Sequence, residues 1–478
     1  MRFLKTLNIL TFFIFFFFVY YNLIGDDLTS LLKKANCIVS QMGGIDGEKH
    51  ISGYPEYEVD KLYREEHKRV DNDDENLRCE RYGLTVYNGT KPRRIFFGAT
   101  IANEIWEMFL IHAIEVYDVY HMAVFVESNT TFMNTPRDLR FKDSEQSNLL
   151  KYSKLFGPKT QIFIDHWLVD APDLVGMTRE SEQRNEIIKR WKSEGMTVDD
   201  VGILSDIDEM YSRDFLRAIQ TCDFPELRPG QDCLRPKILP SAIFFEGSPF
   251  CMKKKQWFHP DAIAGQCIDG IGDPSERVVP LRDHRRRYGE RHASYGKLNS
   301  QSFPEAVFKL GRFPLFNGPD FRTVLGDRGL LYNVVNGSAY GANAVIGAAY
   351  HLHNWFTSLK TVRHKYMTYG HPDLHVMAKT LSQMAEDLDL MVRCSRDLGN
   401  DVVSNDWAKQ YYEGAHDLQG TRPIFFLNKS YTALRHNILK EMVFDDEVEF
   451  GTSYNESGDR VDVKVYRNWS KNEKAIQK

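Results

Sequence analysis

Short apolar runs alternate with longer amphipathic segments between residues 93 and 206. The apolar runs are typical of buried strands and are RRIFFGAT at 93–100, HMAVFVES at 121–128, QIFID at 161–165 and DVGIL at 200–204. The segments 102–117 and 179–195 predict helices, and Gly195 is a stop signal for the second. Strands that alternate with helices at this spacing predict an α/β fold, with a mostly parallel sheet covered by helices on both faces.

The fourth predicted strand ends in a cluster of acids. In VGILSDIDEM, residues 201–210, the apolar run leads into Asp206, Asp208 and Glu209. Ligands of parallel sheets bind outside the carboxyl ends of the strands, so these acids lie where a ligand is expected. Two carboxylates there suit a hard divalent cation such as Mn²⁺ or Mg²⁺. The alternative is an exposed turn in which Asp206 or Ser212 caps the next helix.

Two further D-x-D patterns occur, at 71–73 and 387–389, but neither follows an apolar strand. The pattern at 206–208 is therefore the candidate metal site. A nucleotide-diphosphate sugar suits such a metal, which offsets the negative charge that the leaving diphosphate gains. Glu127 ends the second predicted strand and is expected at the same edge of the sheet.

Basic side chains that could bind a diphosphate are also present. Arg179 and Arg184 lie in TRESEQRN, and RDHRRRYGER at 282–291 supplies a run of arginines. Each of these groups could instead be part of a solvated helix face or surface loop.

Histidines recur in YHLHNWF, residues 350–356. His351 and His353 alternate, so on a strand they would face the same side, and one could be a further metal ligand or a buried, hydrogen-bonded histidine. Trp257 and Trp355 could stack on a sugar, although core packing is the ordinary role of tryptophan.

The N-terminus carries the longest apolar run. Residues 7–24 contain no charged side chain, and as a helix they would span about 27 Å, enough for the hydrocarbon of a bilayer. Arg2 and Lys5 precede the run, while Asp26 and Asp27 follow it, which predicts a cytoplasmic N-terminus and an uncleaved signal-anchor. A cleaved signal peptide is the competing interpretation.

Glycosylation sequons and cysteines agree with a luminal location. The sequons are at Asn88, Asn129, Asn336, Asn428, Asn455 and Asn468. Six cysteines beyond residue 75 allow up to three disulfides, with pairing that the sequence does not determine; they are Cys79, Cys222, Cys233, Cys251, Cys267 and Cys394. Cys37 is left over and is either a free thiol or the bridge of a homodimer.

These features divide the chain into five parts. They are a cytoplasmic tail (1–6), a transmembrane signal-anchor (7–24), a luminal stem (25–92), a catalytic domain (93–398) and a C-terminal extension of open organisation (399–478). A net charge of −5 over 478 residues gives no strong field, so no nucleic-acid partner is expected.

Several stretches in order resemble glycosyltransferase family 17, the inverting N-acetylglucosaminyltransferase III type that adds bisecting GlcNAc. The resembling stretches are FVESNTTF at 125–132, QRN at 183–185, DVGILSDIDEM at 200–210, HPDAIAGQCIDG at 259–270, YHLHNWF at 350–356 and VRHKYMTYGH at 362–371. The chain departs from the family where Met210-Tyr211 replaces Ile-Pro and Tyr350-His351 replaces Trp-His.

The resemblance implies a Rossmann-like GT-A sheet, Mn²⁺ (or Mg²⁺) and UDP-GlcNAc as donor. It implies Asp206 and Asp208 as metal and diphosphate residues and His351 as a late metal ligand. The implied donor-binding residues are Glu127, Arg179, Gln183 and Arg184. The implied acceptor is the β-mannose of an N-glycan core, and the implied location is the Golgi or ER membrane, as a single-pass type II protein.

The catalytic base stays open in the sequence. Inversion needs one carboxylate near the acceptor hydroxyl, and Glu246 and Asp261 are the candidates, with Asp269 and Glu209 also possible. Two other functions remain as alternatives: a metal-dependent phosphohydrolase and a membrane-anchored, non-catalytic glycan-binding protein.

Overall fold

The computed structural model describes the chain in several stretches. These are residues 61–228, 237–240, 242–257, 259–272, 329–332, 348–368, 423–445, 449–454 and 460–464, with helical residues at 387, 388, 390, 391 and 394. The expected anchor at 7–24 lies outside these stretches, and within them no helix is long and apolar enough to cross a bilayer.

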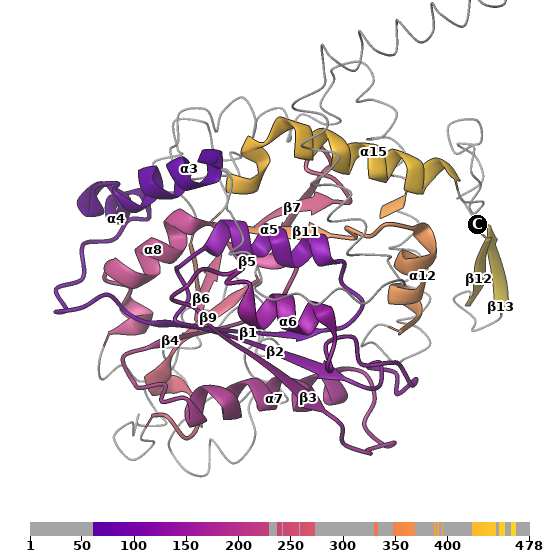
Figure 1. Ribbon diagram of the computed structural model, residues 1–478, viewed down its shortest axis with the longest axis horizontal. Helices are drawn as coiled ribbons and strands as arrows, with labels where there is room; N and C mark the ends of the chain where they lie inside the picture. The colour runs from indigo at the N-terminus through magenta and orange to yellow at the C-terminus, as the bar shows by residue number, and fades with distance from the viewer. Residues whose placement is uncertain are drawn as a thin grey trace, which may run out of the picture. The chain divides into compact units, whose positions relative to one another are not determined.

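Four parallel strands correspond to the four apolar runs. They are β1 (Ile95–Ile101), β2 (Met122–Ser128), β3 (Gln161–Trp167) and β4 (Val201–Asp206). They lie in the order β4-β1-β2-β3 (Figure 1). Thr100 of β1 pairs with Asp206, and the next residue, Ile101, pairs with Glu127. The two acids therefore lie on β4 and β2, the strands on either side of β1, at one edge of the sheet.

Three further strands extend this sheet beyond β4. They are β9 (Asp261–Ala264), β6 (Lys237–Pro240) and β10 (Gly329–Tyr332). β9 is antiparallel to both β4 and β6, whereas β10 is parallel to β6. The sheet is mostly parallel, as predicted. Because β9 runs against β4, its first residue, Asp261, pairs with Leu204 close to the acid end of β4.

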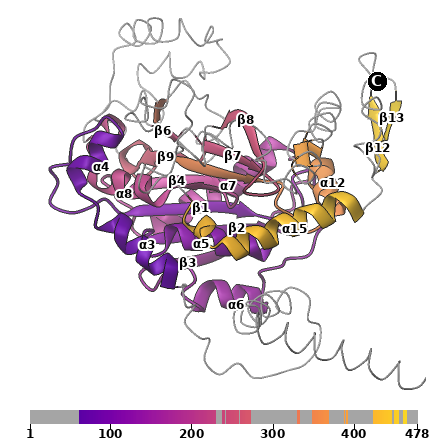
Figure 2. The same ribbon diagram turned by 90° about the horizontal axis from the view of Figure 1, so that it is seen from above.

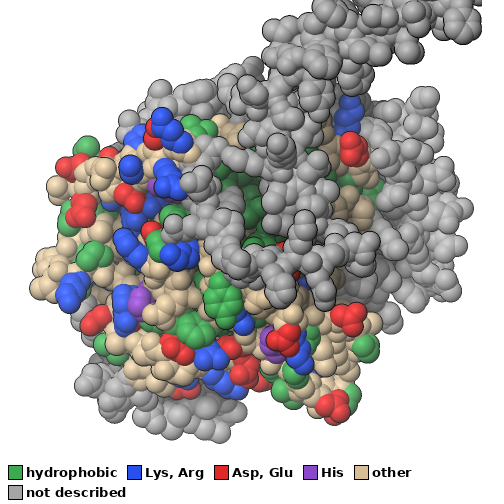
Figure 3. Space-filling model, viewed as in Figure 1, with side chains coloured by type: hydrophobic (Ala, Val, Ile, Leu, Met, Phe, Trp, Pro, Cys, Tyr) green, Lys and Arg blue, Asp and Glu red, His purple; other side chains and the backbone are tan. Residues whose placement is uncertain are grey.

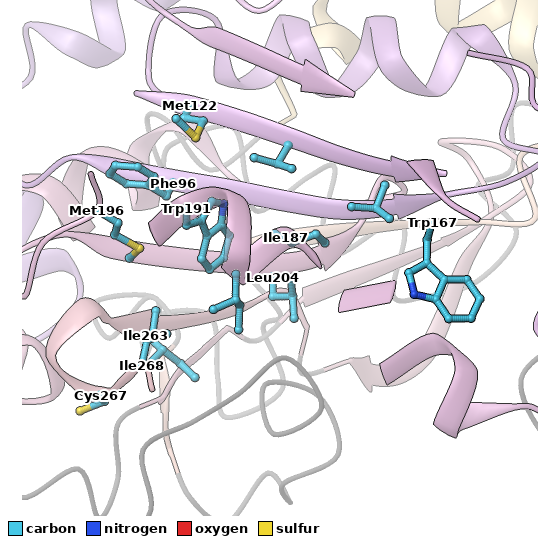
Figure 4. Close-up of a cluster of buried hydrophobic side chains, with 13 residues drawn as sticks. Phe96, Met122, Trp167, Ile187, Trp191, Met196, Leu204, Ile263, Cys267 and Ile268 are labelled. Atoms are coloured by element: carbon cyan, nitrogen blue, oxygen red, sulfur yellow. The ribbon is translucent and has the colours of Figure 1, made fainter. Parts of the chain in front are cut away.

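Helices cover both faces of the sheet, as predicted. The main ones are α5 (Trp106–Val116) on one face and α7 (Met177–Ser193) on the other (Figure 1). Strand side chains alternate between the faces. Phe97 and Phe125 contact each other on the α5 side, where Phe125 also meets Phe109 of the helix. Phe96 joins Trp191 of α7 in the opposite core (Figure 4).

Two strand glycines allow α7 to approach the sheet closely. A Cβ atom at Gly98 would collide with the side chain of Ile187, and one at Gly202 would collide with Trp191. The Trp191 indole also donates a hydrogen bond to the Phe97 carbonyl (3.2 Å). This close packing fixes the helix that carries Arg184 against the strand that carries Asp206.

A C-terminal helix buries the outer side of α5. The elements involved are η8 (Ile424–Leu427) and α15 (Lys429–Asp445). All residues of α5 are buried. Tyr431 hydrogen-bonds Glu107 of α5, and Arg435 pairs with the same carboxylate at 3.2 Å. Figure 2 shows α15 passing beside α5. Part of the extension beyond residue 399 is thus packed against α5.

A second, four-stranded sheet gathers distant parts of the chain. Its order is β5 (Glu209–Tyr211), β11 (Ala349–His353), β7 (Ala242–Glu246) and β8 (Met252–Trp257). β11 lies between β5 and β7, so His351 pairs with Glu209 on one side and with Phe244 on the other. The consecutive strands β6 and β7, separated by one residue, belong to different sheets.

The segment expected as a stem is folded from residue 61 onward. It forms α3 (Lys61–Asp71) and α4 (Glu75–Arg81), which pack against α8 (Arg213–Thr221). Arg78 pairs with Asp214 in a buried ion pair (3.1 Å), and Arg213 pairs with Asp71 (2.7 Å). Residues 61–81 are therefore helical and held on α8 by paired charges, while the bounds of the stem stay a prediction. Acidic and basic side chains mix over this part of the surface (Figure 3).

The remaining described elements are short. They are α6 (Glu145–Tyr152), α12 (Leu359–Thr368), η1 (Pro225–Leu227), η2 (Gly265–Cys267) and the hairpin of β12 (Glu449–Tyr454) and β13 (Arg460–Lys464).

Disulfides connect distant segments of the folded unit. Cys79 is bonded to Cys222, and Cys251 is bonded to Cys394. Cys267 is also disulfide-bonded. Cys37 and the sequons at Asn336, Asn455 and Asn468 lie outside the described residues. Asn88 and Asn129 are exposed, and Asn428 caps a backbone N–H of α15.

Candidate active site

Glu209 holds the turn that follows β4. Its Oε2 accepts hydrogen bonds from the Ser205 hydroxyl (3.1 Å) and from the Asp206 backbone N–H (3.2 Å). Its Oε1 accepts one from the Trp257 indole (2.8 Å). The side chain is 1% exposed. Since Oε2 holds the turn and Oε1 is bound by Trp257 of β8, Glu209 fits a positioning role better than that of a catalytic base.

Asp206 is held by α7. Its Oδ1 accepts a hydrogen bond from Arg184 (2.7 Å), whose guanidinium is also bound to Glu180 of the same helix and to the Ser205 carbonyl. Arg184 is almost fully buried, whereas the Asp206 side chain is 37% exposed. The structure therefore brings together Arg184 and Asp206, which the sequence predicts separately as site residues, and part of the aspartate side chain faces solvent.

Asp208 faces two basic side chains from the later part of the chain. Its Oδ2 lies 3.7 Å from Nε2 of His351 and 3.9 Å from Nζ of Lys365. Burial alone would raise the pKa of Asp208. The nearby imidazole of His351 and the charge of Lys365 outweigh burial, so the pKa of Asp208 is lowered below its ordinary value. The sequence did not indicate Lys365.

His351 fits the metal-ligand role that the resemblance implies. Its ring stacks on Trp257 (4.8 Å between centroids) and meets Phe244 edge-on (4.5 Å), so its orientation is fixed. Its Nδ1 is buried and has no hydrogen-bond partner among the described residues. An imidazole nitrogen 3.7 Å from a carboxylate oxygen matches two ligands about 2 Å from a shared divalent ion. Asp208 and His351 together therefore fit such an ion.

Asp261 forms a pair with His259 at the same edge. The His259 Nδ1 lies 2.5 Å from Oδ2 of Asp261, which is completely buried, while the histidine keeps 22% of its side chain exposed. The His259 ring also contacts Trp257 (5.3 Å). The arrangement is a carboxylate that orients a more accessible imidazole.

Asp269 lies at the opposite edge of the sheet. β9 runs antiparallel to β4. It begins at Asp261, near the acids that follow β4, and ends at Ala264, which pairs with Val201 at the start of β4. Asp269 follows this end, and its neighbour Gly270 packs close to Lys192 at the end of α7. This separation argues against Asp269 as the base.

Glu246 lies in a second cluster with His353 and Asp387, which the sequence did not connect to it. Its Oε2 is 2.9 Å from Nδ1 of His353, which in turn lies 3.6 Å from Oδ2 of Asp387. The rings of His351 and His353 are 5.2 Å apart, so the alternating histidines do face the same side. The first points to Asp208 and the second to Glu246.

Residues 55–228 match the family model of glycosyltransferase family 17. The protein is a glycosyltransferase. The matched range contains the acids that follow β4, and it begins before α3, in agreement with the folded state of α3 and α4. The motifs at 259–270 and 350–356 lie outside it. No curated protein and no solved structure matches the chain.

Two expected donor-binding residues of the glycosyltransferase, Glu127 and Arg179, are buried and hydrogen-bonded to loops. Glu127 is buried and accepts hydrogen bonds from the backbone N–H groups of Arg140 (2.7 Å) and Phe141 (2.9 Å). Arg179 donates to Thr130, Asn134 and two backbone carbonyls of the loop after β3. Both side chains fix loops, and their contact with a donor stays a prediction.

Gln183 differs from these two residues. It is 1% exposed, and its Nε2 has no hydrogen-bond partner within the described stretches. A buried amide without a partner is costly unless a further group binds it. Its donor role also stays a prediction.

The tryptophans of the glycosyltransferase have different roles. Trp257 is partly exposed and belongs to the site through His351 and Glu209. Trp355 is 1% exposed and packs against Arg435 and Phe425, so it belongs to the core. The arginine run at 282–291 lies outside the described residues.

Proposed function

We propose that this glycosyltransferase transfers GlcNAc from UDP-GlcNAc to a glycan with inversion, the acceptor being the β-mannose of an N-glycan core. The family match supports the reaction class. The donor, the acceptor and the GT-A comparison rest on the ordered motifs, of which those at 259–270 and 350–356 supply Asp261 and His351. We further propose Mn²⁺ as the metal and the Golgi or ER lumen as the location of the catalytic region.

The observation that carries this proposal is the meeting of Asp208 with His351. One side chain follows β4 and the other comes from β11, yet their polar atoms lie 3.7 Å apart. When bound there, a divalent ion would offset the charge that develops on the departing diphosphate. Arg184 orients Asp206 beside this position, and Lys365 adds a positive charge.

In this proposal the acceptor hydroxyl is activated by His259, which Asp261 orients. The buried Asp261 carboxylate fixes Nδ1 of the ring, so Nε2 is the nitrogen that takes the proton. His259 and His351 both contact the ring of Trp257, which supports a shared site for the two histidines. The indole of Trp257, which contacts both histidines, is the proposed stacking surface for a sugar.

The test is the release of UDP from several UDP-sugars, measured with and without an N-glycan acceptor. The proposal predicts release that depends on the acceptor and is fastest with UDP-GlcNAc. Release that is equally fast without acceptor would indicate a hydrolase. Glycan binding with no release from any UDP-sugar would indicate a non-catalytic protein.

A further inference from the structure

The cluster of Glu246, His353 and Asp387 lies apart from the acids of the β4 turn. One ligand atom from each residue lies within 4.8 Å of the others. Glu246 is 0% exposed and Asp387 is 4% exposed, so both carboxylates are taken out of water. The three residues come from β7, from β11 and from a helical residue more than thirty positions later. None of them belongs to the D-x-D pattern at 206–208.

The distances in this cluster suit a shared metal ion. Nδ1 of His353 is 2.9 Å from Glu246 and 3.6 Å from Asp387. Ligand atoms that sit about 2.1 Å from one ion lie roughly 3.0–3.5 Å apart, so both separations are close to those of a coordinated set. One imidazole and two carboxylates are ligands that Zn²⁺ and Mn²⁺ accept.

Asn354 supplies an independent observation. It follows His353 in the chain, is 1% exposed and has a left-handed backbone (φ 56°). Its amide nitrogen donates to Glu246 (2.8 Å) and to Tyr366 (3.0 Å) and lies 3.4 Å from Asp387. Its amide oxygen is buried and has no hydrogen-bond partner in the described part of the chain. Turning the amide would place this oxygen among the carboxylates, a position favourable only beside a cation.

We propose that Glu246, His353 and Asp387 bind a second divalent cation, with the amide oxygen of Asn354 as a further ligand. The alternation of β11 gives each ion one histidine, His351 for the catalytic position and His353 for the second. Tyr366, which donates to Asp387 at 2.5 Å, orients one ligand from outside.

The second ion would connect the elements behind the catalytic site. It joins β7 and β11 of the small sheet to the helical residue Asp387, beside the Cys251–Cys394 disulfide and the surrounding core. Since its ligands are nearly all buried, its role is structural rather than catalytic. The proposal goes beyond the transfer reaction and does not depend on it.

The experiment measures metal content and thermal unfolding of the full chain. The purified protein is stripped with chelator, exposed to Zn²⁺ or Mn²⁺ alone, passed through gel filtration and analysed for metal. Wild type should retain an ion that survives in Asp208→Asn, and this ion should raise the melting temperature. His353→Ala should bind it roughly 100-fold more weakly and lose the rise in melting temperature.

Glu246→Gln serves as the milder variant in case His353→Ala fails to fold, with the exposed Glu441→Gln of α15 as its matched control. Glu246→Gln should lose the ion and Glu441→Gln should keep it. These variants are compared in the Asp208→Asn background, and the proposal is overturned if Asp208→Asn with and without Glu246→Gln retains the same amount of metal with the same melting temperature. Because the ion is measured in Asp208→Asn, this result is independent of whether GlcNAc transfer is found.

Discussion

Asp206 and Asp208 are separated by one residue but are held by different parts of the protein. Arg184 of α7 binds Asp206, whereas His351 and Lys365, from β11 and α12, face Asp208. The first contact is made within the parallel sheet and its helices. The second requires the small sheet to form. Asp208 is therefore the side chain at which the two halves of the site meet.

Substituting Asp208 by asparagine removes the negative charge and keeps the shape. We expect Asp208→Asn to lower the rate of GlcNAc transfer by at least about 100-fold, the loss typical of one electrostatic contact to the transition state. The melting temperature should change little. Steady-state kinetics with UDP-GlcNAc and a glycan acceptor provide the measurement.

The matched control for this variant is Asp199→Asn. Asp199 is exposed and lies before β4, at the other end of the same strand. Its substitution should leave both transfer and stability unchanged. Wild-type turnover in Asp208→Asn, or an equal loss in Asp199→Asn, would contradict the role given to Asp208.

Sequence reasoning at this scale succeeds where the chemistry is local. Asp206, Asp208 and Glu209 follow one apolar strand, so their pattern could be read directly. The cluster of Glu246 and His353 could not, because 107 residues separate its members and only the pairing of β7 with β11 brings them together.

At the scale of elements, α3 and α4 are docked by charge as well as by apolar contact. Asp71 at the end of α3 accepts hydrogen bonds from Arg213 (2.9 and 2.7 Å) and from Arg217 (2.8 Å at both oxygens) of α8. The sequence of α3 is charge-dense, which by itself fits either an exposed helix or a solvated spacer. Its partners lie more than 140 residues later, so the docking could not be predicted.

The stability that Asp71 contributes should depend on pH. Burial alone would raise the pKa of Asp71, but hydrogen bonds from Arg217 and Arg213 hold it well below its usual range. In the unfolded chain an aspartate has a pKa of about 4. Because the pKa of Asp71 is lower in the folded protein, its ionised side chain stabilises the fold above about pH 4, and this stabilisation is lost as the pH falls below that value. We expect Asp71→Asn to lower the free energy of unfolding by about 2 kcal/mol at pH 7.

Urea unfolding of wild type and Asp71→Asn across acid and neutral pH measures this difference. The gap between the two proteins should shrink progressively below about pH 4. A gap that stays constant across this range would show that the ion pairs with α8 do not stabilise the docked helix.

At the scale of the molecule, the N-terminal part of the described chain is tied to the sheet by a disulfide. Cys79 of α4 and Cys222, which follows α8, are 143 residues apart in sequence. The double variant Cys79→Ala/Cys222→Ala removes this disulfide. Because the disulfide closes a long loop, it lowers the entropy of the unfolded chain strongly, and its loss should destabilise the fold. We expect a loss of about 2–5 kcal/mol in the free energy of unfolding.

Denaturant unfolding of the purified double variant tests this expectation. Transfer activity under stabilising conditions should be retained, because neither cysteine contacts the β4 acids. An unchanged unfolding midpoint would mean that the ion pairs between α4 and α8 suffice to hold this region.

The four parallel strands and their covering helices could be predicted because each is continuous in sequence and strongly patterned. The small sheet could not, since β5 has only three residues and its partner β11 comes more than 130 residues later. The burial of α5 on every side was also missed, because the covering helix α15 lies beyond residue 428. Tertiary partners that are distant in sequence account for both differences.

The central claim is that Asp208 and His351 bind a divalent ion that in turn binds the diphosphate of the donor. Calorimetric titration of UDP into the wild-type protein, with and without Mn²⁺, tests it most directly. We predict binding that requires Mn²⁺ and is lost in both Asp208→Asn and His351→Ala. Binding of equal strength without Mn²⁺, or Mn²⁺-dependent binding that survives in both variants, would contradict the claim.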